Sequence, residues 1–398
     1  MMRHMGEFSY YNPTKIEFGP GKIAKLAELI PIDKKVLIIY GQNSATKDGT
    51  LDQVYEVLRE YTVDEFGGIE ANPQYETCVQ AIQKVKDEGF DFLLAVGGGS
   101  VIDATKFIAV GAMMEEEPRL IFGGDIGENK PITAELPLAS IVTLPATGSE
   151  ANKGSVITFP EHQAKLGWHS PLVYPQFSIL DPTLTYTLPE RQLANGICDA
   201  FVHTLEIYLT YPVDAKIPDR FAEGILQTLV EVAPDVVDTE QHNYAARANF
   251  MWSATVALNG WLRTGVPEDW STHWLGHEIT ALNGTDHARS LTAILPALMD
   301  IRRQQKAGKL VMYAERVWGI TEGDQDTKID QAIMKTAEFF RSLGMPTCLS
   351  DVGVEEADID FLTEQLVRHD KINLSERGDQ NQTVNRQIYK RALTDFRL

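Results

Sequence analysis

The chain has 398 residues, 43% of them hydrophobic and 23% charged, so it is long enough for two globular domains. Its 36 Lys and Arg against 56 Asp and Glu leave a formal net charge of -20, which disfavours nucleic acids and anionic membranes as partners. Three scattered cysteines rule out a disulfide framework, and no signal-like apolar run follows the N-terminus, so we expect a cytoplasmic protein.

The first part of the chain alternates short apolar runs with helical patterns. Val36–Tyr40, Phe92–Val96 and Leu138–Leu144 are typical of strands that are buried on both faces. Strands that alternate with helices predict a parallel sheet with right-handed crossovers. Ser155–Phe159 and Leu172–Leu180 also look extended, and from them we expect a small antiparallel addition to the sheet.

From Pro189 onward the pattern becomes helical. Helices are expected over Arg191–Thr210, Asp219–Val232, Tyr244–Leu262 and Ile329–Leu343. We therefore predict an α/β domain over residues 1–185 and an all-α domain over residues 186–398.

The loops after the predicted strands favour a dinucleotide. Gly97–Ser100 follows one strand and opens a helix, so bare backbone N–H groups can approach a pyrophosphate, although a structural turn needs glycines too. After another strand, Gly41–Ser44 offers no carboxylate to repel a 2'-phosphate, which favours NADP over NAD. The third strand end adds hydroxyl groups at Thr143, Thr147 and Ser149. Together these loops predict a Rossmann-like dinucleotide-binding domain.

Five polar side chains in the second half are candidate metal ligands. Asp199 and His203 are four residues apart, on one face of a largely apolar helix, where a buried pair needs a partner. His273 and His277 repeat that spacing, and His287 follows. These donors suit zinc or iron(II), and since four suffice, one of the five has another role. The alternative for the helical pair alone is a surface or capping interaction.

A metalloprotease site is the first alternative for these histidines. His277-Glu278 begins an H-E-x-x-H pattern, but position 281 is Ala rather than His. The motif is therefore incomplete, and the sequence does not favour a protease.

Taken together, the motifs resemble the iron-containing (group III, metal-dependent) alcohol dehydrogenase family over essentially the whole chain. The matching features are Gly97–Ser100 with Asp103, the Thr143–Glu150 stretch, the helix of Asp199 and His203, and the series His273, His277 and His287. Within the family the sequence is most similar to the butanol-dehydrogenase-like, NADPH-dependent aldehyde reductases of bacteria, at Pro73–Thr77, Asn195–His203 and Asp214–Gly224.

The resemblance implies roles for individual residues. Its metal ligands fall on Asp199, His203, His273 and His287. The remaining His277 matches a residue beside the nicotinamide, and Asp103 matches one near the reacting end of the cofactor, so both are catalytic candidates that also contact the cofactor. The other cofactor contacts implied are Gly41, Ser44, Gly98, Gly99, Ser100, Thr143, Thr147 and Lys165.

One segment departs from the subgroup's pattern. The NADPH-using members usually show Gly-Gly-Gly-Ser after the first strand, whereas this chain has Gly41-Gln42-Asn43-Ser44. Because the serine is kept and no acidic residue appears, NADP(H) is still favoured over NAD(H). The family also suggests a homodimer.

The implied reaction interconverts aldehydes and primary alcohols. A bound divalent ion, iron or zinc, would act as Lewis acid while hydride passes between nicotinamide and carbonyl carbon. A relay through His277 or the cofactor ribose would supply the proton. Trp252, Trp261, Trp270 and Trp274 could form an apolar wall for the substrate, or belong to the core.

Three other functions fit parts of the sequence. A polyol dehydrogenase and a lyase resembling dehydroquinate synthase share the scaffold, but the first usually lacks one of these histidines. The lyase needs basic residues clustered for a phosphorylated substrate, and none gather in sequence near the candidate ligands. A non-catalytic dinucleotide sensor would not need the complete set of metal ligands.

Overall fold

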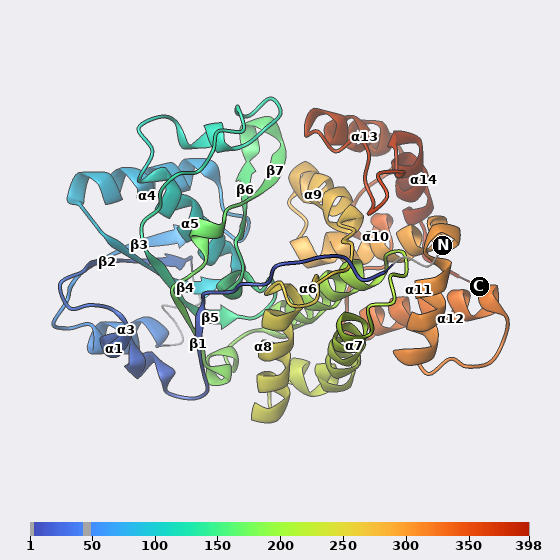
Figure 1. The fold of residues 1–398 in the computed structure, drawn as a ribbon, viewed down its shortest axis with the longest axis horizontal. Coiled ribbons are helices and arrows are strands. Elements are labelled where there is room, and N and C mark those ends of the chain that lie inside the picture. Colours follow the sequence, from blue (N-terminus) through green and yellow to red (C-terminus); the bar gives the residue numbers. More distant parts are fainter. Residues whose placement is uncertain (1–3, 43–48, 398) are drawn as a thin grey trace. The chain divides into compact units, whose positions relative to one another are not determined.

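The computed structural model describes residues 4–42 and 49–397, and the chain divides into two compact units (Figure 1). The α/β unit comprises Tyr11–Pro189 and Asp238–Thr255. The helical unit comprises the segment ending at Tyr10, Glu190–Val237 and the chain from Val256 onward.

The α/β unit contains a parallel sheet. Within the described residues it has six strands in the order β1-β8-β5-β4-β2-β3, and each neighbouring pair runs parallel. The strands are β1 (Lys15–Phe18), β2 (Lys35–Gly41), β3 (Thr62–Ile69), β4 (Phe92–Gly98), β5 (Leu138–Leu144) and β8 (Phe177–Leu180). The three strands predicted from apolar runs are confirmed as β2, β4 and β5.

Alternate residues of each central strand enter two different apolar clusters. Leu37 and Ile39 of β2 belong to the cluster that includes residues of α4 and α5. Val36 and Ile38 belong to the cluster that includes residues of α1 and α3. Because successive side chains of a strand point to opposite faces, a strand covered on both faces is apolar throughout. The helices of this unit are α1 (Leu26–Leu29), α3 (Thr50–Val57), α4 (Tyr75–Glu88), α5 (Gly99–Gly111) and α8 (Tyr244–Leu258) as far as Thr255.

The predicted antiparallel addition is partly wrong. Ser155–Phe159 does form an antiparallel pair as β6 (Gly154–Phe159), but its partner is β7 (Ala164–His169), which the sequence did not reveal. Of the stretch Leu172–Leu180, only β8 is extended, and it joins the main sheet in parallel between β1 and β5. All four residues of β8 are buried, as expected for an inner strand.

The helical unit is built from packed helices. They are α6 (Glu190–Tyr208), α7 (Lys216–Val237), α9 (Ser271–Asn283), α10 (His287–Ile301), α11 (Arg303–Arg316), α12 (Gln325–Ser342), α13 (Ile359–Arg368) and α14 (Gln382–Ala392). An apolar core joins α9, α10, α13 and α14. The described part of this unit has no named strand, which confirms the all-α prediction. In the described residues, no helix is long and apolar enough to cross a membrane.

Candidate metal centre and cofactor loops

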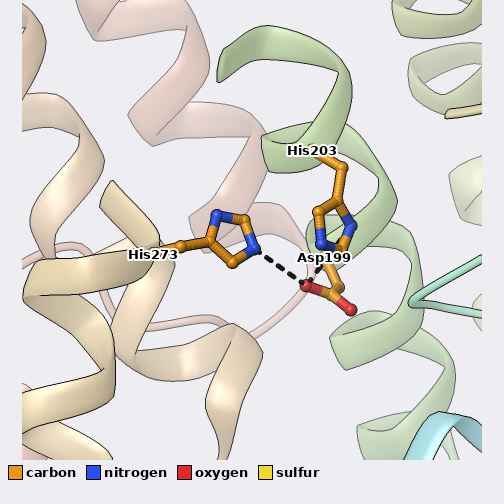
Figure 2. Close-up of side chains that lie close together, drawn as sticks. All are labelled: Asp199, His203 and His273. Atoms are coloured by element: carbon orange, nitrogen blue, oxygen red, sulfur yellow. Dashed lines mark ion pairs between the residues drawn. The ribbon is translucent and has the colours of Figure 1, made fainter. Parts of the chain in front are cut away.

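Three helices of the helical unit bring four predicted ligands around one carboxylate oxygen. Asp199 and His203 lie one turn apart on α6, His273 lies in the first turn of α9, and His287 is the first residue of α10. Asp199 Oδ1 is 3.7 Å from His203 Nδ1, 3.9 Å from His273 Nε2 and 3.6 Å from His287 Nε2. Figure 2 shows the first three side chains pointing toward one another.

These separations fit a metal ion. Two donors that are each about 2.1 Å from a tetrahedral ion lie about 3.4 Å apart. The three distances from Asp199 Oδ1 are close to this value, and the ligand atoms of Asp199, His203 and His273 all lie within 4.8 Å of one another. Asp199 Oδ1 and His203 Nδ1 are buried, and neither has a hydrogen-bond partner among the described residues. Burial lowers the pKa of the His203 imidazole to about 4, so the ring is neutral near pH 7 and keeps a lone pair. The donor set suits zinc or iron(II).

A carboxylate that the sequence analysis missed contacts one of these histidines. Glu206 is buried on α6, and its Oε2 meets His273 Nδ1. Asp199, His203 and Glu206 are spaced i, i+4 and i+7, so all three share one helix face. That spacing was visible in the sequence. The contact with His273, 67 residues further on, was not.

His277 stands one turn beyond His273 on α9. Its ring centroid lies 5.2 Å from that of His287, 6.2 Å from that of His273 and 5.6 Å from that of Trp274. The side chain is buried. His277 is therefore a close neighbour of two of the four predicted ligands, and its role beside the nicotinamide stays a prediction.

Of Trp252, Trp261, Trp270 and Trp274, two lie beside these histidines. The Trp270 ring is 5.3 Å from that of His273, and the Trp274 ring neighbours His277. Trp252 and Trp261 are instead 45% and 37% exposed. Of the four, only Trp270 and Trp274 are placed to form a wall next to the predicted ligands.

The predicted cofactor loops lie at the carboxyl ends of neighbouring strands in the α/β unit. Gly41 ends β2, Gly98 ends β4, and Thr147 follows β5, the strand that carries Thr143. Such strand ends are where open α/β sheets bind ligands. Ser44 lies outside the described residues.

The helix after β4 begins without a side-chain cap. Gly98 is the N-cap of α5, so the first-turn N–H groups of that helix suit a phosphate. A Cβ on Gly99 would collide with the Thr147 side chain, so glycine allows the two loops to approach closely. Ser100 Oγ donates a hydrogen bond to Ala71 O.

Asp103 has both carboxylate oxygens engaged within the α/β unit. Ser149 Oγ donates to Oδ1 at 2.6 Å, and the Val156 N–H donates to Oδ2 at 2.9 Å. Burial raises the pKa of Asp103. These contacts tie α5 to the loop after β5 and to β6. Lys165, on β7, is buried and donates to Asn72 Oδ1 at 3.0 Å.

Lys106 was not singled out from the sequence. It is fully buried and donates to Ser149 Oγ at 2.9 Å, to Asn152 Oδ1 at 3.0 Å and to Gly154 O at 2.8 Å. Burial lowers its pKa to about 8. Lys106 therefore fixes the loop that carries Thr147 and Ser149.

Two family models together match most of the chain. The model described as iron-containing alcohol dehydrogenase covers residues 13–182, and the model for the C-terminal part of the Fe-containing alcohol dehydrogenase family covers residues 193–393. The chain belongs to the iron-containing alcohol dehydrogenase family. The resemblance and the fold class inferred from the sequence are thereby confirmed.

Individual members of the family are closely similar. The chain is 52% identical to the NADPH-dependent aldehyde reductase YqhD of Escherichia coli, covering 98% of this chain and 100% of the relative. It is 38% identical to the probable NADH-dependent butanol dehydrogenase 1 of Bacillus subtilis, covering 91% and 93%. A crystal structure of E. coli YqhD superposes with a TM-score of 0.95 at 51% identity, over 98% and 100% of the chains. NADH-dependent butanol dehydrogenase A of Thermotoga maritima gives a TM-score of 0.92 at 32% identity, over 98% and 100%.

Proposed function

We propose that this protein reduces aldehydes to primary alcohols, and catalyses the reverse reaction, with NADP(H) and one divalent metal ion. The observation that carries the proposal is the convergence of three imidazole nitrogens on Asp199 Oδ1, within 3.9 Å, in a member of this family. Such a cluster of neutral and anionic donors is suited to a cation that acts as a Lewis acid.

Asp199, His203, His273 and His287 hold the ion, iron or zinc, in this proposal. When bound, the ion stabilises negative charge on the carbonyl oxygen, and the reduced nicotinamide supplies the hydride. His277 takes part in moving the proton that completes the alcohol, since an imidazole ring can accept a proton at one nitrogen and donate one from the other.

The dinucleotide is held by small side chains and backbone groups. Gly98, Gly99 and Ser100 receive the pyrophosphate at the start of α5. The remaining contacts in the proposal are Gly41, Ser44, Asp103, Thr143, Thr147 and Lys165. Asp103, whose oxygens are both engaged by the protein, acts by shaping the loops near the reacting end of the cofactor.

Preference for NADP(H) rests on the end of β2. Gly41 and Gln42 present no carboxylate there, and the relative at 52% identity is named as NADPH-dependent. Gln42→Asp should lower the ratio of NADPH to NADH rates, because the new carboxylate repels a 2'-phosphate and accepts from a ribose hydroxyl. An unchanged ratio would show that another segment chooses the cofactor.

The wider organisation is also part of the proposal. In the proposal the dinucleotide-binding domain spans residues 1–185 and the metal-binding domain residues 186–398, although Asp238–Thr255 pack within the α/β unit and the segment ending at Tyr10 within the helical unit. The enzyme works in the cytoplasm as a homodimer on a small aldehyde or alcohol. Size-exclusion chromatography with light scattering tests the dimer.

The decisive experiment follows NADPH oxidation with butyraldehyde. Metal-depleted protein should be inactive, and Fe(II) or Zn(II) should restore turnover. Because the chemistry is a net reduction, NADPH must be consumed in step with the alcohol formed. A lyase resembling dehydroquinate synthase would consume none, and a polyol dehydrogenase would prefer a diol over butanol in the reverse direction. Absence of activity across aldehydes with each metal supplied would refute the proposal and favour a dinucleotide sensor.

A further inference from the structure

Glu206 binds both the side chain and the backbone of His273. Its Oε2 contacts the imidazole Nδ1. Its Oε1 accepts the Thr272 N–H at 2.5 Å and the His273 N–H at 3.3 Å. These are first-turn donors of α9, and Trp270, the N-cap residue, makes no side-chain capping bond. Glu206 therefore caps α9 from another helix, which fixes the position of the His273 backbone.

The contact at Nδ1 also selects the tautomer of His273. A metal ion takes an imidazole lone pair, so the proton of a neutral, coordinating His273 must lie on its other nitrogen. The nitrogen that faces Asp199 is Nε2, at 3.9 Å, and the nitrogen that faces Glu206 is Nδ1. A carboxylate at Nδ1 accepts that proton in a hydrogen bond and leaves the Nε2 lone pair directed at the metal position.

Glu206 is held in turn by a buried charged network. The Asp269 N–H donates to the backbone oxygen of Glu206, and Asp269 Oδ1 accepts the Ser271 N–H at 2.9 Å. Asp269 Oδ2 pairs with Lys306 Nζ at 2.7 Å. Lys306, also buried, donates to Leu209 O at 2.5 Å, just beyond the end of α6. The end of α6 and the start of α9 are thus fixed to each other around Glu206.

We propose that Glu206 is a positioning residue of the metal centre, which sets the affinity for the ion by fixing the tautomer and orientation of His273. This inference rests on the proposed function, because it takes Asp199, His203, His273 and His287 as the ligands. Carboxylates behind ligating histidines typically account for a 10- to 100-fold difference in metal affinity, roughly the effect expected here.

The chain offers a matched control on α9, the helix that carries His273. Glu278 of α9 is buried, and its Oε1 lies 2.8 Å from Nδ1 of His369, which is also buried. This pair has the same chemistry as Glu206 and His273, but His369 is not among the proposed ligands. Glu278→Gln therefore reproduces the loss of a buried carboxylate at an imidazole without touching the ligand set.

Cobalt(II) is a suitable probe, because its visible absorption reports binding without any turnover. Full-length wild type, Glu206→Gln and Glu278→Gln are stripped of metal and titrated with Co(II) against a competing chelator. We expect the dissociation constant of Glu206→Gln to rise by roughly 10- to 100-fold and that of Glu278→Gln to stay at the wild-type value. Melting temperatures are measured with and without Co(II). Both variants should melt earlier as apo proteins, but only Glu206→Gln should gain less stability from the metal.

The outcomes separate this inference from the proposed function. If wild type binds no Co(II), the proposed metal centre itself is wrong. If wild type binds and folded Glu206→Gln binds equally tightly, only the role of Glu206 is overturned. If Glu206→Gln does not fold, Glu206→Asp takes its place, since it keeps the charge but shortens the reach by one methylene. A folded Glu206→Asp with wild-type affinity would likewise overturn the inference.

Discussion

The predicted metal cluster of the helical unit and the predicted cofactor loops of the α/β unit differ in how their buried polar groups are bonded. In the cluster, Asp199 Oδ1 and His203 Nδ1 are buried with no hydrogen-bond partner among the described residues. In the loops, both oxygens of Asp103 and the ammonium of Lys106 are bonded to the protein itself. Both sets are buried, but of these atoms only Asp199 Oδ1 and His203 Nδ1 still need a bonding partner.

From this difference we expect the first set to bind a ligand and the second to hold the scaffold in place. An unsatisfied buried polar atom costs free energy, so an ion that satisfies it binds with a matching gain. Satisfied groups such as Asp103 and Lys106 hold loops in place, so in the proposal most hydrogen bonds to the dinucleotide come from glycine N–H groups, hydroxyls and the first turn of α5. Substitutions in the cluster should therefore remove metal, and substitutions around the loops should change stability or cofactor affinity instead.

His273→Ala should have the largest effect. It removes one of four donors and leaves Glu206 without its imidazole, so we expect loss of the bound metal and a fall in turnover of at least about 10³-fold. Elemental analysis and butyraldehyde reduction measure the two effects. His162→Ala, at an exposed histidine of the α/β unit, is the control and should behave as wild type. Full activity in metal-free His273→Ala protein would contradict the assignment.

The contribution of Lys106 to the stability of the fold should depend on pH. Its pKa is lowered from 10.5 to about 8 in the folded chain, mainly by burial. Between these values the unfolded chain keeps a proton that the folded chain has lost, so stability rises with pH. Relative to Lys106→Met, the free energy of unfolding of wild type should therefore increase by about 3 kcal/mol from pH 8 to 10.5. Urea titrations at several pH values test this, and a flat or falling difference would contradict it.

The sequence predicted the architecture well where the pattern was local. Val36–Tyr40 and Phe92–Val96 are apolar throughout because helices cover both faces of the sheet, and that burial leaves a direct trace in composition. β1 and β7 show no such run of apolar residues in the sequence. β1 has only two apolar residues, Ile16 and Phe18, and β7 is defined by its pairing with β6 rather than by its own pattern. Pairing between strands depends on contacts that one segment cannot show.

The candidate site also divides into contacts within one helix, which the sequence predicts, and contacts between elements, which it does not. Spacing on single helices predicted the pairs Asp199 with His203 and His273 with His277, because residues four apart share a face. That His287 joins the first pair depends on how three helices pack, and the family resemblance supplied it. Neither Glu206 nor Lys106 was found, since each is defined by partners on other elements.

His277→Ala tests whether His277 is one of the metal ligands. If His277 moves a proton and is not a ligand, the variant should retain its metal while turnover falls by about 10²-fold. His287→Ala is the matched comparison, because the two rings lie 5.2 Å apart, and it should lose the metal. Elemental analysis of both variants decides. Loss of metal from His277→Ala would place His277 among the ligands.

Gly99→Ala should have the smallest effect and should change only the binding of the cofactor. The added methyl group would come within 3.0 Å of the Thr147 side chain, which must then move away from α5. Both residues are proposed to contact the dinucleotide, so we expect the KM for NADPH to rise about tenfold, the loss of roughly one hydrogen bond to a charged group. Metal content should not change.

The control for that experiment is Gly224→Ala on α7, where a Cβ meets nothing within 4 Å and where alanine favours the helix. It should leave the KM unchanged. If Gly99→Ala also lowers metal content, the predicted cofactor loops and the predicted metal ligands depend on each other. The two sets of residues could then not be treated as independent. If the KM for NADPH stays at the wild-type value, the helix start of α5 is not where the pyrophosphate binds. Only a higher KM for NADPH with unchanged metal content in Gly99→Ala agrees with both expectations, that the loops bind the cofactor and that the cluster binds the metal independently.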